Sequence, residues 1–164
     1  MKWFKRQQKQ GGVSIDKVVF SLINLSRDVV KDASGNLEKR LDAKDRTKLP
    51  EIQTELLCFF LFALDYWWQT QRAHTEEDKR IWGEIYGAHL RILFGGDPAG
   101  LAMWDTFQQR LISYGQIVNA EKGGNAKLGI KLSEFCGLPG NLDLLLLPAS
   151  LFQAALVAVS SFRR

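Results

Sequence analysis

The most distinctive stretch of the chain runs from residue 56 to residue 68 and reads LLCFFLFALDYWW. Consecutive residues of an α-helix are turned by about 100°, so Phe59, Phe60, Leu61 and Phe62 leave almost none of the circumference polar. A helix that is apolar all round must be enclosed by other helices, by a partner protein or by lipid. The pattern therefore predicts a central helix, over about residues 51–72, that other parts of the chain surround.

Apolar residues with a period near 3.6 also occur in the N-terminal half of the chain. A first helix is expected between Ser14, a candidate N-cap, and Gly35, a candidate stop. Residues 36–49 alternate charges of both signs, which is typical of a solvated helix or an ordered loop. Thr75 and Asp78 resemble a capping box, with Asp in place of the usual Glu, and predict that a third helix begins there.

The C-terminal half continues the same helical spacing. Asp97 followed by Pro98 pairs an N-cap residue with a proline suited to the first helical position, so a fourth helix should start at this point. A short apolar stripe over residues 128–135 predicts a further helix, and Pro148 is expected to interrupt the run before the last one. We therefore expect an all-α, single-domain bundle of five to six helices that covers residues 13–164.

The formal net charge of +4 is concentrated at the two ends of the chain. Removing the six basic residues of positions 1–9 and 163–164 from the total of 22 leaves 16 against 18 acidic residues, so the remainder is slightly acidic. Nucleic-acid binding needs basic side chains gathered on one surface, and we expect none. Residues 1–12 are predicted to form a flexible basic arm, for which peripheral contact of residues 1–9 with an anionic membrane is a minor alternative role.

Two cysteines, Cys58 and Cys136, lie far apart in sequence and outside any metal-binding spacing. We expect buried thiols in a reducing, cytoplasmic compartment, although a disulfide between them is an open alternative. No metal ion or other cofactor is predicted. The positively charged N-terminus is not followed by the apolar segment of a signal peptide.

A membrane-spanning role is not expected from the lengths of the apolar segments. Residues 144–159 would extend about 24 Å as a helix, short of the ~30 Å apolar core of a bilayer, and they contain Pro148. Asp65 similarly argues against insertion of the central helix, because a carboxylate at mid-bilayer costs about 2.5 to 3.5 kcal/mol.

Asp65 is the first candidate for chemistry because it lies within the apolar helix and needs a partner if it is buried. His89 and Arg110 are predicted to lie on inward faces of the third and fourth helices, and either could reach it. A polar cluster that fixes helix register is the preferred interpretation. A catalytic or ligand-binding acid–base pair is the alternative.

Aromatic residues form the second lead, since Trp and Tyr are enriched at binding surfaces. Three consecutive large rings at residues 66–68 cannot all point into one core, so at least one should line a cleft or meet another chain. Ordinary wrapping by neighbouring helices is the plainer alternative. With the two polar partners, the candidate residues are Asp65, Tyr66, Trp67, Trp68, Trp82, Tyr86, His89, Trp104, Arg110 and Tyr114.

These observations favour a non-catalytic helical protein that acts in the cytoplasm by binding a protein, either a second copy of itself or a partner to which it serves as an adaptor. The alternative is a binder or enzyme for a small apolar molecule, with Asp65 and His89 in an aromatic-lined pocket.

Overall fold

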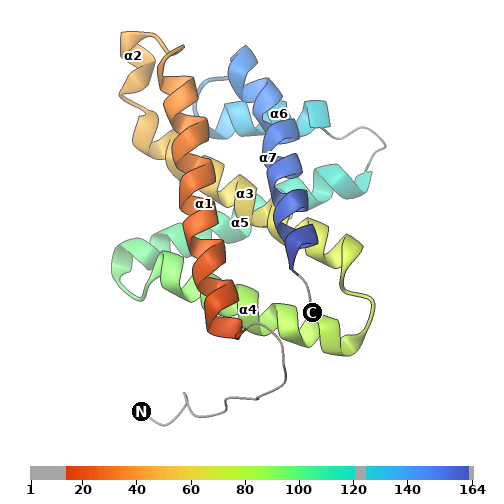
Figure 1. Ribbon diagram of the computed structural model, residues 1–164. Helices are drawn as coiled ribbons and strands as arrows, with labels where there is room; N and C mark the ends of the chain where they lie inside the picture. Colours follow the sequence, from red (N-terminus) through yellow and green to blue (C-terminus); the bar gives the residue numbers. More distant parts are fainter. Residues whose placement is uncertain (1–13, 121–124, 163–164) are drawn as a thin grey trace.

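A computed structural model describes residues 14–120 and 125–162, and within these ranges the chain forms seven α-helices and no β-strand (Figure 1). The helices are α1 (Ile15–Glu38), α2 (Ala43–Arg46), α3 (Leu49–Gln71), α4 (Glu76–Phe94), α5 (Pro98–Ala120), α6 (Asn125–Phe135) and α7 (Leu142–Ser161). The predicted all-α bundle is confirmed, and the four-residue α2 brings the number of helices above the five to six expected. The arm predicted at residues 1–12 lies outside the described residues.

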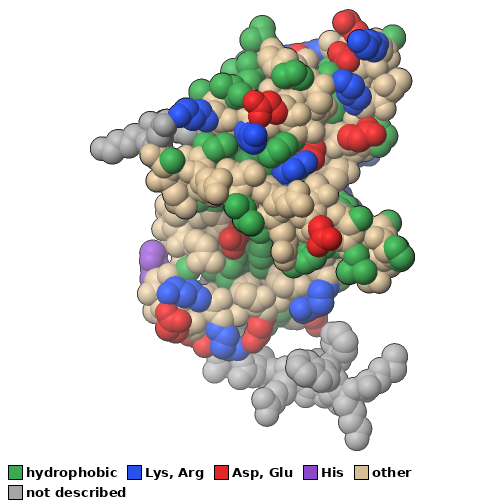
Figure 2. Space-filling model, turned by 180° about the vertical axis from the view of Figure 1, so that it is seen from behind, with side chains coloured by type: hydrophobic (Ala, Val, Ile, Leu, Met, Phe, Trp, Pro, Cys, Tyr) green, Lys and Arg blue, Asp and Glu red, His purple; other side chains and the backbone are tan. Residues whose placement is uncertain are grey.

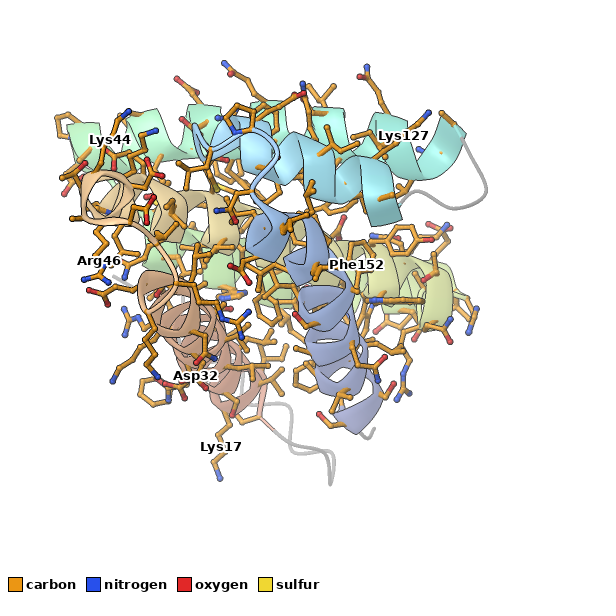
Figure 3. The ribbon with its side chains drawn as sticks, turned by 90° about the horizontal axis from the view of Figure 1, so that it is seen from above. Lys17, Asp32, Lys44, Arg46, Lys127 and Phe152 are labelled. Carbon is orange, nitrogen blue, oxygen red and sulfur yellow. The ribbon has the colours of Figure 1, made fainter. Side chains whose placement is uncertain are left out.

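Helix α3 is the central element of the bundle and contacts α1, α4, α5, α6 and α7. In Figure 1, α1 and α7 lie in front of it and α4 crosses the lower end of the molecule. Seen from above, α5 and α6 lie on the side of α3 opposite to α1 and α7 (Figure 3). The helix predicted over about residues 51–72 is therefore present and sandwiched between two layers.

Over residues 58–64 the side chains of α3 are shielded from solvent around the whole circumference. Phe59, Phe60, Leu61 and Leu64 are fully buried and Phe62 is 5% exposed. Burial of a side chain of this size contributes about 1.5 to 3 kcal/mol, so these residues form the centre of the core. The aromatic rings meet at their edges, with Phe59 and Phe152 of α7 at 5.5 Å between ring centroids.

The predicted starts of α4 and α5 are confirmed by capping hydrogen bonds, whereas α1 begins after Ser14 without a side-chain capping bond. Thr75 Oγ1 accepts a hydrogen bond from the backbone N–H of Asp78, and the Asp78 carboxylate accepts one from the backbone N–H of Thr75, both at 3.1 Å. The side chain of Asp97 caps α5 by accepting from the Gly100 N–H at 2.7 Å. These local bonds satisfy N–H groups that lack a partner inside the helix.

Two residues expected to stop helices instead lie inside them. Helix α1 continues through Gly35 to Glu38, and α7 begins at Leu142 and continues through Pro148. Glycine costs about 1 kcal/mol within a helix and proline about 3. The burial of Leu37, which is 2% exposed and follows Gly35, offsets the cost of the glycine. The burial of Leu144, which is fully buried and precedes Pro148, offsets the cost of the proline in the same way.

Gly129 allows α6 to lie very close to α7. A Cβ atom at this position would be 2.2 Å from the carbonyl oxygen of Leu145. No side chain fits in that space, so the absence of a Cβ is required for the contact between the two helices.

Candidate functional site

Asp65 is held by an indole ring rather than by a charged group. The Trp82 Nε1–H of α4 donates a hydrogen bond to Asp65 Oδ1 at 2.7 Å. Trp82 is stacked between Trp68, at 4.6 Å, and Tyr86, at 5.0 Å between ring centroids. The Tyr86 hydroxyl in turn donates to the Leu61 carbonyl oxygen at 2.8 Å. This cluster joins α3 to α4 and satisfies the half-buried carboxylate.

His89 lies fully buried between α4 and α1, where its Nε2 is 3.2 Å from Ser26 Oγ. The other ring nitrogen, Nδ1, has no hydrogen-bond partner among the described residues. Burial lowers the pKa of His89 to about 4, because the charged imidazolium would lose its hydration. The ring is therefore neutral near pH 7 and is a poor general base, since an efficient base has a pKa near the working pH.

A buried ion pair joins α3 to α5. Arg110 donates two parallel hydrogen bonds to Glu55, from Nε at 2.7 Å and from Nη2 at 2.6 Å. Its guanidinium lies 3.7 Å from the ring centroid of Phe135 on α6, a cation–π contact. The hydrogen bonds with Glu55 raise the pKa of Arg110 above its usual value. Glu55 is only 6% exposed, so the pair fixes three helices relative to one another.

Three further titratable groups lie near this ion pair and are kept neutral by burial. Burial first, and then the charge of Glu55, raises the pKa of both the Cys58 and Cys136 thiols to about 12. The same two causes raise the pKa of Tyr114 well above its usual value. Both cysteines are free and buried, which agrees with the expected thiols and not with the alternative disulfide. Thiols in this state are poor nucleophiles.

The remaining predicted aromatic residues contact the core at separate places. The Trp67 Nε1–H donates to the backbone carbonyl of Phe152 on α7 at 2.9 Å, and Tyr66 packs on the same Phe152 ring at 5.5 Å. Trp104 lies elsewhere, against Phe94 and Phe107. Tyr66 and Trp67 are half-buried, so wrapping by α7 accounts for much of their surface.

The structure therefore does not bring the predicted residues into one pocket. The expectation that Asp65 pairs with His89 or Arg110 is wrong, because His89 bonds Ser26 and Arg110 bonds Glu55. Glu55 was not among the residues predicted for the site, although it is buried and pairs with Arg110. Its spacing of four residues from Phe59, on a helix apolar all round, was the signal that it is buried.

Two hollows of the described surface lie between helices. One, of about 360 Å³, separates α1 from α7 and is lined by Ala33, Asn36, Leu37, Arg40, Asp143, Leu146, Leu147 and Ser150. The other, of about 330 Å³, lies between α1, α3 and α5. Neither is lined by Asp65 or by an aromatic residue, so the aromatic-lined pocket of the alternative hypothesis does not correspond to either hollow.

The outer face of α7 differs from the surfaces of the other long helices in having no charged residue among its exposed ones. Its exposed residues are Leu142, Leu146, Ala149, Ser150, Gln153, Val157, Ser160 and Ser161. Leu142 and Leu146 are each 74% exposed and Val157 is 58% exposed. Protein surfaces are usually rich in Lys, Arg, Asp and Glu, and an exposed apolar patch often marks an interaction site.

Helix α7 is also longer than the sequence indicated. Among the described helices it is the one whose length and composition would allow it to cross a membrane, with 20 residues and a mean hydropathy of 2.0. The earlier length argument fails because the helix starts at Leu142 and does not break at Pro148. The core helices of soluble proteins can be equally long and apolar, so the length and composition of α7 alone define no membrane role.

The described residues hold no candidate metal site, and the charges on one face of the molecule are mixed in sign. On the face opposite to α1 and α7, basic and acidic side chains are interspersed (Figure 2). No group of three or more His, Cys, Asp or Glu residues in the described part of the chain is arranged to hold a metal ion.

Comparison of the chain with protein-family models, with curated proteins and with solved structures gives no match.

Proposed function

We propose that the protein is a non-catalytic helical interaction protein that associates with a second copy of itself through the outer face of α7. The supporting observation is that the exposed residues of this face include Leu142, Leu146 and Val157, and that Asp143, the charged residue at its edge, is paired with Arg40. The buried titratable groups support a non-catalytic role, because His89 and the Glu55–Arg110 pair are enclosed in the core and already hydrogen-bonded.

The order of residues along the face favours a second copy as the partner. Large side chains, Leu142 and Leu146, lie at one end and Val157 at the other, while Ala149 and Ser150 lie between them. Two such helices crossing in antiparallel directions would place the small residues at the crossing point and each leucine end against the valine end of the other copy. This arrangement is self-complementary, as a two-fold symmetric interface requires.

The hollow between α1 and α7 adds a receptor for side chains of the second copy. Leu146 and Leu147 of α7 and Ala33 and Leu37 of α1 contribute its apolar lining. The ion pair between Arg40 and Asp143, at 2.5 Å, lies beside this lining and provides a polar rim. An apolar centre with a polar rim is the usual composition of a protein interface.

Contacts of α7 with the bundle favour a protein partner over insertion into lipid. Its inner side chains Phe152, Ala155 and Val159 are buried in the core. Its backbone also accepts hydrogen bonds from side chains of α3 and the residue that follows it: Trp67 donates to the carbonyl of Phe152, and Arg72 donates to the carbonyl of Ser160. Withdrawal of α7 into a bilayer would lose these contacts and expose the surface of α3.

The cytoplasm is the proposed location. Cys58 and Cys136 are free thiols, and free thiols persist in reducing compartments. This assignment is tested by fractionation of the source cell, in which recovery of the protein mainly in a secreted or membrane fraction would contradict it.

Sedimentation equilibrium over a wide range of protein concentrations tests self-association. We expect a monomer–dimer equilibrium that the Leu146→Glu variant weakens at least tenfold, because a buried unpaired carboxylate costs more than the ~1.4 kcal/mol that a factor of ten requires. Ile112→Glu is the matched control: Ile112 is 63% exposed on α5, away from the α7 face, and its replacement should leave the equilibrium unchanged.

A monomer at all concentrations, or a dimer equally stable in both variants, would contradict the proposal. Binding of the monomer to neutral phosphatidylcholine vesicles, lost in Leu146→Glu, would show that the face meets lipid instead. Binding to a different protein with the same dependence on Leu146 would replace self-association by the adaptor role.

A further inference from the structure

We propose that the hollow between α1, α3 and α5 binds a small amphiphilic anion, with a short apolar body and one carboxylate or phosphate head group. This site is separate from the outer face of α7 and does not depend on self-association. Its lining residues are Ser26, Arg27, Val30 and Lys31 of α1, Pro50, Gln53, Thr54 and Leu57 of α3, and Met103 of α5.

The rim of the hollow is positively charged. Arg27 and Lys31 are exposed and lie one turn apart on α1, so their side chains follow the same edge. No acidic residue lines the hollow, and the ion pairs within the described residues involve neither cation. Both cations are thus available to an anionic group from outside.

The start of α3 forms the opposite wall. The helix begins at Leu49, so Pro50 lies in its first turn. The Gln53 side-chain amide donates to Ser34 Oγ at 3.3 Å, and the Thr54 hydroxyl to the Pro50 carbonyl at 3.1 Å, which orient these two polar groups of the wall.

The floor is largely apolar and suits a hydrocarbon body. Val30, Leu57 and Met103 are half-buried and contribute most of it. Ser26 is the polar exception: it is fully buried, lines the hollow and contacts His89 at 3.2 Å. Because the His89 ring is neutral, this pair adds no charge beneath the ligand.

The size of the hollow, about 330 Å³, suits a small ligand. Octanoate and octyl phosphate share a short apolar body and differ in the head group, so the comparison between them identifies the preferred head group.

Met103 provides a direct test, because it lines the hollow, whereas the other methionine, Met1, lies outside the described residues. In the full chain labelled with ¹³C at the methionine methyl groups, NMR titration with octanoate or octyl phosphate should shift the Met103 signal until saturation. Octylammonium, of opposite charge, and acetate, without the apolar body, should have little effect.

Charge variants test the role of the rim. We expect Arg27→Gln combined with Lys31→Gln to weaken binding about three- to tenfold, as the loss of two exposed ionic contacts predicts. The matched control combines Lys17→Gln with Lys44→Gln, which removes the same charge from exposed residues near the start of α1 and on α2, at separate places in Figure 3. All of these positions are exposed, so the variants should fold.

Three results would overturn the proposal. The first is that neither anion shifts the Met103 signal below its micelle concentration. The second is that octylammonium shifts this signal as much as the anions do. The third is that the two double charge variants lose the same affinity for the anions. A shift that depends on Arg27 and Lys31 and on both parts of the ligand supports it.

Discussion

His89 makes the stability of the fold depend on pH. The imidazole is fully buried, and burial lowers its pKa to about 4, while an ordinary histidine titrates near pH 6.5. Between these two pH values the unfolded chain binds more protons than the folded one. The contribution to stability is therefore complete above about pH 6.5 and is lost as the pH falls toward 4.

The magnitude follows from the gap between the two pKa values. At about 1.36 kcal/mol for each pH unit, the whole gap corresponds to about 3 kcal/mol. About 2 kcal/mol of this should already be lost at pH 5. Domains of this size are stable by only about 5 to 15 kcal/mol, so the loss is a large part of the total.

Urea unfolding at pH 7.5 and pH 5.0, followed by tryptophan fluorescence, measures this loss. Carboxylates also titrate near the lower pH, so the comparison is with His89→Gln, which does not titrate and retains an amide that can hydrogen-bond Ser26. We expect His89→Gln to lose about 2 kcal/mol less than the natural protein between these pH values. His74→Gln is the control, because His74 is exposed, and it should behave as the natural protein.

The reasoning would be refuted if the natural protein and His89→Gln lost the same free energy of unfolding between pH 7.5 and 5.0. It would also be refuted if His74→Gln, rather than His89→Gln, removed the pH dependence.

Three further predictions concern the buried polar groups. Replacing Arg110 by Met should lower the free energy of unfolding by about 3 to 5 kcal/mol, because it leaves the carboxylate of Glu55 buried and unpaired, and the additional replacement of Glu55 by Met should restore much of the loss. Asp65→Ala should mainly lower stability, by about 1 to 3 kcal/mol, because it leaves a buried indole N–H without its acceptor. Cys58 and Cys136 should react slowly with a thiol reagent in the folded protein and rapidly in urea, because burial raises their pKa to about 12.

Each of these predictions has a contrary result. An Arg110→Met variant as stable as the natural protein would show that Glu55 is not held as a buried anion. A fully stable Asp65→Ala variant that loses dimerisation or ligand binding would give Asp65 a direct functional role. Rapid modification of either thiol without urea would show that the core opens at that position.

The helices and their starts were largely predictable because the signals are local. The Thr75–Asp78 capping box and the Asp97–Pro98 pair involve residues three positions apart or adjacent, and both mark helix starts in the structure. The enclosure of the middle of α3 on every side was predictable for the same reason, because consecutive apolar residues cover the whole circumference of a helix.

The helix ends and the pairing of polar groups were harder to predict because they depend on distant residues. Gly35 and Pro148 were expected to stop helices, and their intrinsic cost favours a stop. Burial of Leu37 and Leu144 against other helices outweighs that cost, and this burial is visible only in the folded bundle.

By itself the amino-acid sequence determined that the chain is all-α and that one helix is enclosed on every side, because both properties follow from the residues within a few turns. Only the tertiary structure decided that Glu55 meets Arg110, 55 positions along the chain, and that Asp65 bonds Trp82 instead of His89. It also decided which side of α7 faces solvent. These outcomes depend on how the helices pack, since hydrogen bonds and buried ion pairs require atomic distances that helical periodicity does not specify.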